Sequence, residues 1–330
     1  ITDIARFWIE ETGVDGYRID AARHLVEDGA IQVDTPATLA WLEAFRVTLP
    51  ADTLVLGEVW APAEIVANYL PDALDLAFEF DLANATVQGV AGADAGAVAD
   101  SLERVAGLYP NGQHAVFLSN HDQERVMSRF GISPAKARMA ATLLLTYPGV
   151  PFVYYGEEVG MSGRKPDPRL RTPMPWTGES PGVGFTTGEP WEEPQSGSAT
   201  SNVEDQSGDP SSLLSLYRDL IELRRDHPAL RYGDTIVLET GSVWLLAYLR
   251  TIGDDHVLVV ANLGIADVTD YGLTLEGGGP TGVVEAVGLI GAGDFVPTVP
   301  GETGGFEGYR PLETLPGHTA VVIGLTGIDG

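Results

Sequence analysis

The chain has 330 residues, 44% of them hydrophobic, and a formal net charge of −28 at pH 7. This acidic excess argues against nucleic acid and anionic membranes as partners, because both bind cationic patches, whereas a neutral polysaccharide stays acceptable. The absence of cysteine excludes disulfides, cysteine nucleophiles and thiolate metal sites.

The first 60 residues predict a helix followed by two strands. Apolar residues recur at helical spacing over 2–12, and Gly13 ends the helix. Strands are predicted over 16–19 and 53–56, with a helix near 35–48 between them. Each strand runs directly into an acidic residue, which is Asp20 in GYRIDAARH and Glu58 in LVLGEVW.

Alternation of strands and helices continues to about residue 155. The further strands are predicted over 74–78, 115–118 and 152–155, and the further helices near 94–107 and 134–146. This alternation is typical of parallel βα units. The fourth strand leads into SNHDQERV, which places His121 and Asp122 where a strand gives way to a loop.

The second half of the chain changes character twice. Residues 163–209 are rich in Gly, Pro, Ser and Thr, which predicts a long surface excursion rather than a domain. A helix with a wide apolar stripe is predicted over 210–226. After Gly233 come the short β-type runs TIVLE, VWLLAYLR, VLVVANL, VVEAV and TAVVIGL, separated by turn residues. They predict a small antiparallel β-sandwich.

The acidic residues at the strand ends suggest a sugar-cleaving site. Arg18 and Asp20 lie two residues apart on one strand, so both face the same side, and a nearby guanidinium keeps a nucleophilic carboxylate ionised. Glu58 would instead have to stay protonated until it donates its proton to the glycosidic oxygen, and burial beside an aromatic surface such as Trp60 would raise its pKa. Glycoside hydrolysis needs such a pair of carboxylates. Each feature also has a structural interpretation. Arg18 and Asp20 could form a structural ion pair, Glu58 could cap the end of a strand, and Asn120-His121-Asp122 could be an ordinary turn.

The segments GYRIDAARH, LVLGEVW and AVFLSNHDQERV resemble the second, third and fourth signature regions of the α-amylase family, glycoside hydrolase family 13. The stretches TYPGVPFVYYGEEVGM, RTPMPW, GFTTGEPW and NVEDQSGDPSSLLSLYRDLIELRRDHPAL are similar to the end of the family barrel and its closing helix. The resemblance covers residues 1–232 through specific motifs, and the remainder by position and composition.

The resemblance implies a role for each matching residue. Asp20 is expected to be the nucleophile, Glu58 the general acid/base and Asp122 the transition-state stabiliser. Arg18 and His121 are expected to bind the sugar beside them. No cofactor is implied for the chemistry, and a structural calcium ion would take its ligands mostly from a part of the family fold that these residues lack.

Three further residues are expected to contact substrate. His24 lies where the family usually has a Lys-His pair, with Arg23 in place of the Lys. Trp60 follows the predicted acid, and Arg171 in RTPMPW resembles a position near the first sugar.

The resemblance implies a TIM-type (β/α)8 barrel of which only strands four to eight are present, over residues 1–232, followed by the antiparallel β-sandwich over 233–330. A closed barrel takes about 250 residues and eight strands. The family's first signature region, which supplies an Asp and a His, has no counterpart here. We therefore expect a companion N-terminal half that carries the first three βα units and the inserted domain. An extracellular location is favoured over a cytoplasmic one, because any signal peptide would precede Ile1.

The favoured function is a retaining α-glucan hydrolase or transglycosylase that acts on α-1,4 bonds, as the small Ala21 after the nucleophile suggests. The motifs RTPMPW and GFTTGEPW lean toward α-glucosidase and trehalose-synthase relatives, so maltooligosaccharides are as plausible a substrate as starch. A non-catalytic, amylase-like carbohydrate-binding or ancillary subunit is the alternative of another class, although such proteins typically lose the catalytic carboxylates. A metal hydrolase is disfavoured, because the acids and histidines lack tight ligand spacing.

Overall fold

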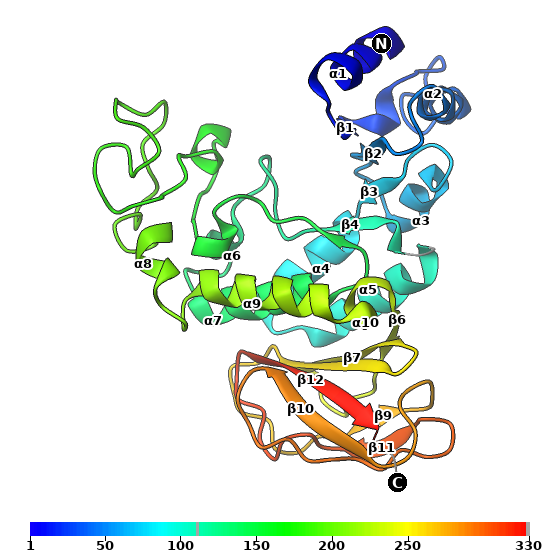
Figure 1. Ribbon diagram of the computed structural model, residues 1–330, viewed down its shortest axis with the longest axis vertical. Helices are drawn as coiled ribbons and strands as arrows, with labels where there is room; N and C mark the ends of the chain where they lie inside the picture. Colours follow the sequence, from blue (N-terminus) through cyan, green and yellow to red (C-terminus); the bar gives the residue numbers. More distant parts are fainter. Residues whose placement is uncertain (110–111, 328–330) are drawn as a thin grey trace.

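Five parallel strands form the first sheet of the computed structural model, which describes residues 1–109 and 112–327 (Figure 1). The strands are β1 (Gly16–Ile19), β2 (Leu54–Gly57), β3 (Leu76–Phe78), β4 (His114–Val116) and β5 (Val150–Pro151). Each pairs with the next along the chain, so their order in space is their order in sequence. The predicted parallel α/β layer is confirmed. Within the described residues, β1 and β5 are the edge strands of an open sheet.

Helices precede and connect these strands, as parallel pairing requires. They are α1 (Thr2–Thr12), α2 (Pro36–Val47), α3 (Ala63–Val66), α4 (Phe80–Gly92), α5 (Ala95–Leu108), α6 (Val126–Arg129) and α7 (Pro134–Thr146), with the 3-10 turns η1 (Ala22–His24) and η2 (Ala67–Tyr69). Helix α4 was not predicted, because glycines and Thr86 make it a weak helix former. Glu79 caps its first turn, and Gly89 lets it approach Val98 of α5 closely. No described helix has the length and apolar character needed to cross a membrane.

The two faces of the parallel sheet have different partners. Val55 of β2 points into the main core, which the helices share. Arg18, Leu56 and Leu76 are paired in register across β1, β2 and β3, so they share the opposite face. Apolar side chains of Leu56, Leu76, Ala115, Phe78 and Phe152 form a small cluster on that face. Strand residues alternate between faces, so residues two positions apart face the same way. Asp20 and Glu58, two positions after Arg18 and Leu56, therefore lie at the end of the face that carries this cluster.

The C-terminal strands form an antiparallel five-stranded sheet and a small second sheet. The larger sheet has the order β10 (Val284–Ile290), β12 (Thr319–Gly327), β8 (Asp255–Asn262), β7 (Leu245–Ile252) and β6 (Asp234–Val237). The smaller sheet pairs β9 (Leu273–Leu275) with β11 (Phe306–Tyr309). All five β-type runs are strands, as predicted. The two strands of the smaller sheet, β9 and β11, were not predicted.

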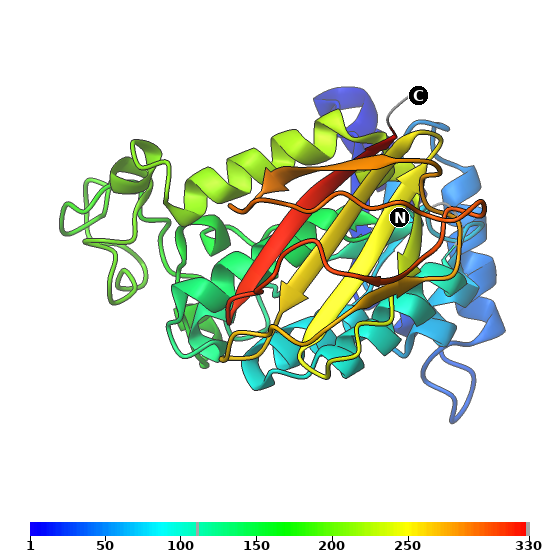
Figure 2. The same ribbon diagram turned by 90° about the horizontal axis from the view of Figure 1, so that it is seen from below.

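The larger antiparallel sheet is covered on both faces. Leu249 and Leu258 pack against Leu273 and Phe306 of the small sheet. Tyr248 and Val259 on the other face belong to the same core as the helices. Figure 2 shows the strands lying across that helical layer. The predicted sandwich is therefore partly right, because helices cover one face and β9 and β11 cover the other.

The excursion over 163–209 forms a lobe that stands apart from the sheets, on the left of Figure 1. Around and after it lie the 3-10 turns η4 (Glu157–Val159) and η5 (Asp167–Leu170) and the helices α8 (Val203–Ser207), α9 (Leu213–Asp226) and α10 (Pro228–Tyr232). Strand β5 is shorter and earlier than the predicted 152–155, because the pairing ends at Pro151. The amide of Phe152 still donates to the carbonyl of Val116 at 2.8 Å.

A buried guanidinium joins the antiparallel sheet to the helices. Arg250 of β7 is 1% exposed and donates to the carbonyls of Thr146, Leu230 and Gly233 at 2.8, 3.1 and 2.9 Å. These carbonyls belong to α7, α10 and the residue that follows α10. Burial lowers the pKa of Arg250 to about 9. The arginine thus satisfies backbone groups at helix ends that would otherwise be buried without a donor.

Replacing Arg250 by Ala should lower the free energy of unfolding by about 3 to 5 kcal/mol, because three buried carbonyls lose their donor and a cavity forms. Thermal unfolding followed by circular dichroism measures this loss. Arg225→Ala is the matched control, since Arg225 is exposed and its partners among the described residues are the exposed Glu222 and Asp226. Arg225→Ala should leave the midpoint temperature of thermal unfolding unchanged. Equal losses in both variants would contradict the role given to the buried bonds.

Candidate active site

The three acidic residues lie at the carboxyl edge of the parallel sheet. Asp20 follows β1, Glu58 follows β2 and Asp122 lies in the loop after β4. Two backbone hydrogen bonds tie the first two ends together, from the Glu58 amide to the Ile19 carbonyl and from the Ala22 amide to the Glu58 carbonyl, both at 2.9 Å. In parallel α/β folds this edge is where functional loops gather.

Backbone geometry turns the chain sharply after Asp20. Ala21 has φ 43° and ψ 45°, in the left-handed region that non-glycine residues rarely adopt. This conformation ends β1 and starts the turn η1. Asp20 is thus the last residue that projects from the strand. Strain of about 1 to 2 kcal/mol is typical of such a residue and is often found at functional sites.

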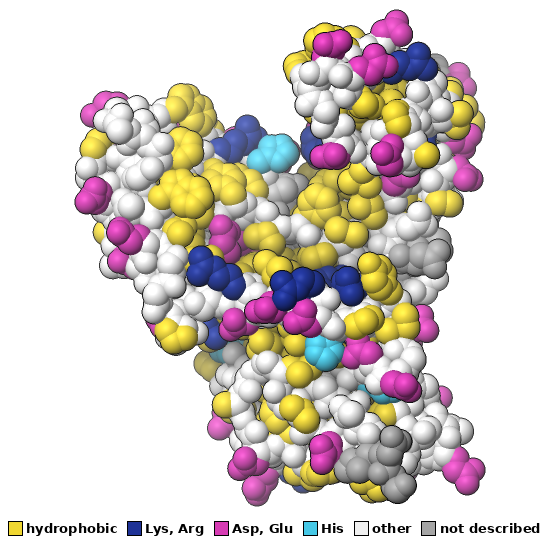
Figure 3. Space-filling model, in the orientation of Figure 1, with side chains coloured by type: hydrophobic (Ala, Val, Ile, Leu, Met, Phe, Trp, Pro, Cys, Tyr) yellow, Lys and Arg dark blue, Asp and Glu magenta, His cyan; other side chains and the backbone are white. Residues whose placement is uncertain are grey.

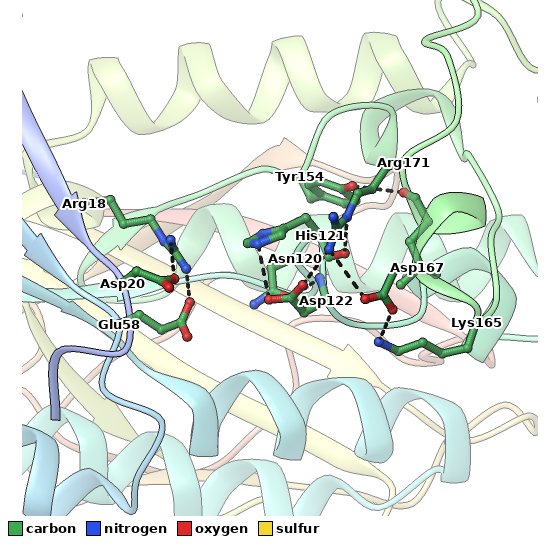
Figure 4. A network of polar contacts seen from close by, with 11 residues as sticks. Arg18, Asp20, Glu58, Asn120, His121, Asp122, Tyr154, Lys165, Asp167 and Arg171 are labelled. Carbon is green, nitrogen blue, oxygen red and sulfur yellow. Dashed lines mark hydrogen bonds and ion pairs between the residues drawn. The ribbon is translucent and has the colours of Figure 1, made fainter. Parts of the chain in front are cut away.

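One guanidinium holds two of the carboxylates. Arg18 Nη1 lies 2.8 Å from Asp20 Oδ1, and its Nη2 bonds the carboxylate of Glu58. Figure 4 shows the guanidinium pointing at both acids. The side chain of Asp20 is 78% exposed, whereas that of Glu58 is 17% exposed. The structure therefore brings together one open and one sheltered carboxylate on a shared cation.

Asp122 is fixed from both sides in a second group. Its Oδ2 lies 3.2 Å from His121 Nε2, and its Oδ1 lies 2.8 Å from Arg171 Nη2. Its amide donates to Asn120 Oδ1 at 2.9 Å, so the loop closes on itself. Arg171 also donates from Nε to the His121 carbonyl at 3.1 Å. The guanidinium from the excursion thus holds the loop that carries Asp122.

The comparisons with known proteins decide the family. The family model described as "Alpha amylase, catalytic domain" matches residues 1–233. The chain belongs to the α-amylase family of glycoside hydrolases.

Two curated relatives of this α-amylase family chain are Alpha-amylase 3 of Dictyoglomus thermophilum and an oligo-1,6-glucosidase of Halalkalibacterium halodurans. The first is 34% identical over 271 residues, covering 80% of this chain and 52% of that protein. The second is 31% identical over 205 residues, covering 50% of this chain and 36% of that protein. The chain thus spans about half the length, or less, of these relatives. The solved α-amylase of H. orenii matches 98% of this chain and 63% of its own, with 28% identity and a TM-score of 0.75.

Two further residues predicted to bind sugar, Trp60 and His24, lie in the segments that follow β2 and β1. Trp60 is 56% exposed, and its ring stacks on Phe80 with centroids 5.0 Å apart. Arg23 donates to the Trp60 carbonyl at 2.6 Å and pairs with Asp34, which anchors the loop after β2. His24 is exposed on η1. Among the described side chains, no hydrogen bond or ion pair links the Arg18 group to the Asp122 group.

Sequence reasoning missed part of the Asp122 group. Asp167 Oδ2 lies 3.7 Å from Arg171 Nη2, and Asp167 also bonds Lys165. No motif marks these residues, which lie at and just before the start of the 3-10 turn η5. Within residues 1–109 and 112–327, no group of at least three His, Asp or Glu side chains is placed to hold a metal ion. The calcium prediction stays a prediction.

Arg125 and Glu157 are buried and form hydrogen bonds with segments next to the site. Arg125 donates to the carbonyls of Leu170 and Tyr155 at 3.0 and 2.6 Å, so it holds these two loops together. Glu157 is buried and accepts hydrogen bonds from the hydroxyls of Tyr217 and Ser119, at 3.0 and 3.4 Å. Burial raises the pKa of Glu157 from 4.5 to about 8. This carboxyl is therefore mostly protonated at neutral pH.

The raised pKa of Glu157 predicts how stability depends on pH. The folded state binds the proton more tightly than the unfolded chain, so this contribution is complete below pH 4.5 and is lost as pH rises through about 8. Glu157→Gln stays neutral throughout. Between about pH 5 and about pH 9 it should gain a few kcal/mol on the wild type, because a tenfold change in proton binding corresponds to about 1.4 kcal/mol. Urea unfolding across this range measures the difference, and parallel curves would contradict the assignment.

Proposed function

We propose that the chain carries the reacting groups of a retaining glycoside hydrolase that cleaves α-1,4-glucosidic bonds in α-glucans. The observation that supports it most is the guanidinium of Arg18, which bonds Asp20 and Glu58 at the ends of neighbouring strands. A retaining glycosidase needs two carboxyl groups close together, about 5 to 5.5 Å apart, one as nucleophile and one as acid. Membership of the α-amylase family supports the same chemistry.

The different exposure of the two acids suits their different roles, with Asp20 as the nucleophile and Glu58 as the general acid/base. The open carboxylate of Asp20 attacks the anomeric carbon and forms a covalent glycosyl-enzyme, while Glu58 protonates the departing glycosidic oxygen. In the second step Glu58 takes a proton from water, and the resulting hydroxide displaces Asp20, so the α-anomer is retained. Asp122 stabilises the positive charge on the sugar ring in both transition states. No cofactor takes part.

Arg18 orients both reacting groups. Its Nη1 bonds Asp20 and its Nη2 bonds Glu58, so one guanidinium fixes the positions of the nucleophile and the acid relative to each other.

The alternative within the same chemistry is an α-glucosidase or a trehalose-synthase-like transglycosylase. Relatives named oligo-1,6-glucosidase and trehalose synthase/amylase, and the motifs RTPMPW and GFTTGEPW, support it. A non-catalytic ancillary subunit is less well supported, since Asp20, Glu58 and Asp122 are all present.

We also propose that residues 1–232 supply strands four to eight of a (β/α)8 barrel and that 233–330 form its C-terminal β-domain. A companion N-terminal half, in the same or a second polypeptide, would provide the other three βα units. The open edge of β1 and the exposed Ile4, Phe7 and Trp8 of α1 support this, because both leave apolar or unpaired surface uncovered. An extracellular location remains the favoured one.

Asp20→Asn should lower turnover of maltooligosaccharides by several orders of magnitude in the complete enzyme, because the covalent intermediate no longer forms. Glu58→Gln should be nearly as severe, but should spare the first step for substrates with good leaving groups, which need little protonation. Steady-state and burst kinetics with maltoheptaose and an activated aryl glucoside measure both. Asp219→Asn, on the exposed side of α9, is the control and should keep wild-type rates. More than about a tenth of the wild-type rate in either site variant would contradict the roles.

Residues 1–330 purified alone should show negligible cleavage of maltooligosaccharides and should aggregate or pair through strand edges. Adding the N-terminal half should restore activity. Size-exclusion chromatography and reducing-sugar release measure the two effects. A monodisperse, fully active monomer of these residues alone would overturn the proposed division.

A further inference from the structure

Arg23, in the turn η1 after β1, has all three guanidinium nitrogens bonded to other groups of the protein. Its Nη1 donates to the Trp60 carbonyl at 2.6 Å, and its Nε donates to Asp34 Oδ1 at 3.2 Å. Its Nη2 bonds the other oxygen of the same carboxylate. The side chains of Arg23 and Asp34 are only 20% and 24% exposed, so a bound sugar would meet little of either.

Asp34 is itself held in place by two further bonds. The hydroxyl of Tyr69, a buried residue in the segment after β2, donates to Asp34 Oδ1 at 2.7 Å. The Asp34 amide donates to the Arg23 carbonyl at 2.9 Å, so backbone and side chains both join the pair. Arg23, Asp34 and Tyr69 are called the clamp below. The clamp connects the chain after β1 with the chain after β2.

The clamp extends a series of bonds between the two segments that carry Asp20 and Glu58. The amide and the carbonyl of Glu58 are already bonded to the backbone at the end of β1 and in the turn after it. Arg23 adds the next bond of the series, to Trp60, two residues beyond Glu58. A side chain thus continues the connection where the backbone pairing of β1 with β2 ends.

The loop after β2 needs such bonds, because it borders open space. Figure 3 shows a hollow between the N-terminal lobe and the lobe of the excursion, and the loop lies at the carboxyl edge of the sheet beside it. The ring of Trp60 stacks on the buried Phe80 with an interplanar angle of 5°. The ring is therefore held by packing, and the backbone of the loop is held by the clamp.

We propose that Arg23 is a positioning residue for the reaction, because through the clamp it fixes the backbone that carries the acid Glu58 relative to the nucleophile Asp20. This inference rests on the proposed function and concerns a residue that does not touch the substrate. A retaining glycosidase needs its two carboxyl groups about 5 to 5.5 Å apart, and a misplacement of about 1 Å can cost about a hundredfold in rate.

The residue type at position 23 matters for this role. A planar guanidinium can bond both oxygens of Asp34 and reach the Trp60 carbonyl at the same time. Lysine, which the family usually has at this place, carries the same charge on a single nitrogen and cannot span these acceptors. Arg23→Lys therefore keeps the charge and removes the geometry.

The test compares Arg23→Lys with the wild type in the complete enzyme. The kcat for maltoheptaose should fall by about tenfold to a hundredfold while KM changes by less than about twofold, because the acid is misplaced and the sugar contacts stay. The first step with an activated aryl maltoside, read from the burst of released aryl alcohol, should slow by less than about threefold, since a good leaving group needs little protonation. Asp34→Asn should give the same pattern.

Arg46→Lys is the matched control. Arg46 donates from Nε to Asp75 Oδ1 and from Nη2 to the Ala51 carbonyl, both at 3.0 Å. The side chains of this pair are 19% and 29% exposed, so the partners and the burial match those of Arg23. Ala51 and Asp75 precede β2 and β3, at the edge opposite the proposed reacting carboxylates. Both lysine variants should lose thermal stability, whereas only Arg23→Lys should lose kcat.

An unchanged kcat in folded Arg23→Lys, or equal falls for the two substrates, would overturn the positioning role. Calorimetric titration of maltoheptaose in an Asp20→Asn background gives a readout without turnover. Unchanged affinity on adding Arg23→Lys supports the proposal, whereas weaker binding would overturn it, because Arg23 would then contact the sugar. Failure of the proposed function looks different: Asp20→Asn alone would keep its activity, and the positioning role would fail with the catalytic assignment.

Discussion

The geometry of this site depends on the ion pairs of Arg18 at the end of β1. Parallel strands that are neighbours in sequence end at one edge, and this places Asp20 and Glu58 within reach of one guanidinium. Two carboxylates that are close enough to bond the same guanidinium would repel each other without that cation between them. The strand register therefore decides the site, because a shift of one residue would send Arg18 to the helical face.

Arginines have two separate functions in this acidic protein. Arg18 and Arg171 bond carboxylates at the open edge of the sheet, where solvent and substrate have access. Arg125, Arg224 and Arg250 are buried and donate chiefly to backbone carbonyls at loop and helix ends. A planar guanidinium can serve several acceptors at once, which suits both functions. The buried group makes the scaffold rigid, and the exposed group orients the acids on it.

Much of the fold and the chemistry could be predicted from local patterns. Strand residues alternate and helices repeat every three to four residues, so β1, β2, α2, α7 and the five strands of the larger antiparallel sheet could be predicted from the sequence. Helix α4 was not predicted, although Phe80, Ala83, Val87 and Val90 are buried at helical spacing; Gly89 among them lowers the helix propensity and packs close to Val98 of α5. The partners of Asp122 could be predicted only in part: His121 is its sequence neighbour, whereas Arg171 arrives from an excursion 49 residues later, whose path depends on tertiary contacts.

Arg171 lines a cavity of about 370 Å³ beside the excursion and also bonds the carboxylate of Asp122. A side chain shared in this way couples two equilibria, because whatever orders the excursion also orders the loop after β4. By thermodynamic linkage the effect is reciprocal: a ligand that holds the wall still lowers the entropy lost when Asp122 is fixed, and fixing Asp122 favours the ordered wall to the same extent. Any molecule that occupied this cavity would thus affect the order of Asp122 through one guanidinium, without a change in fold.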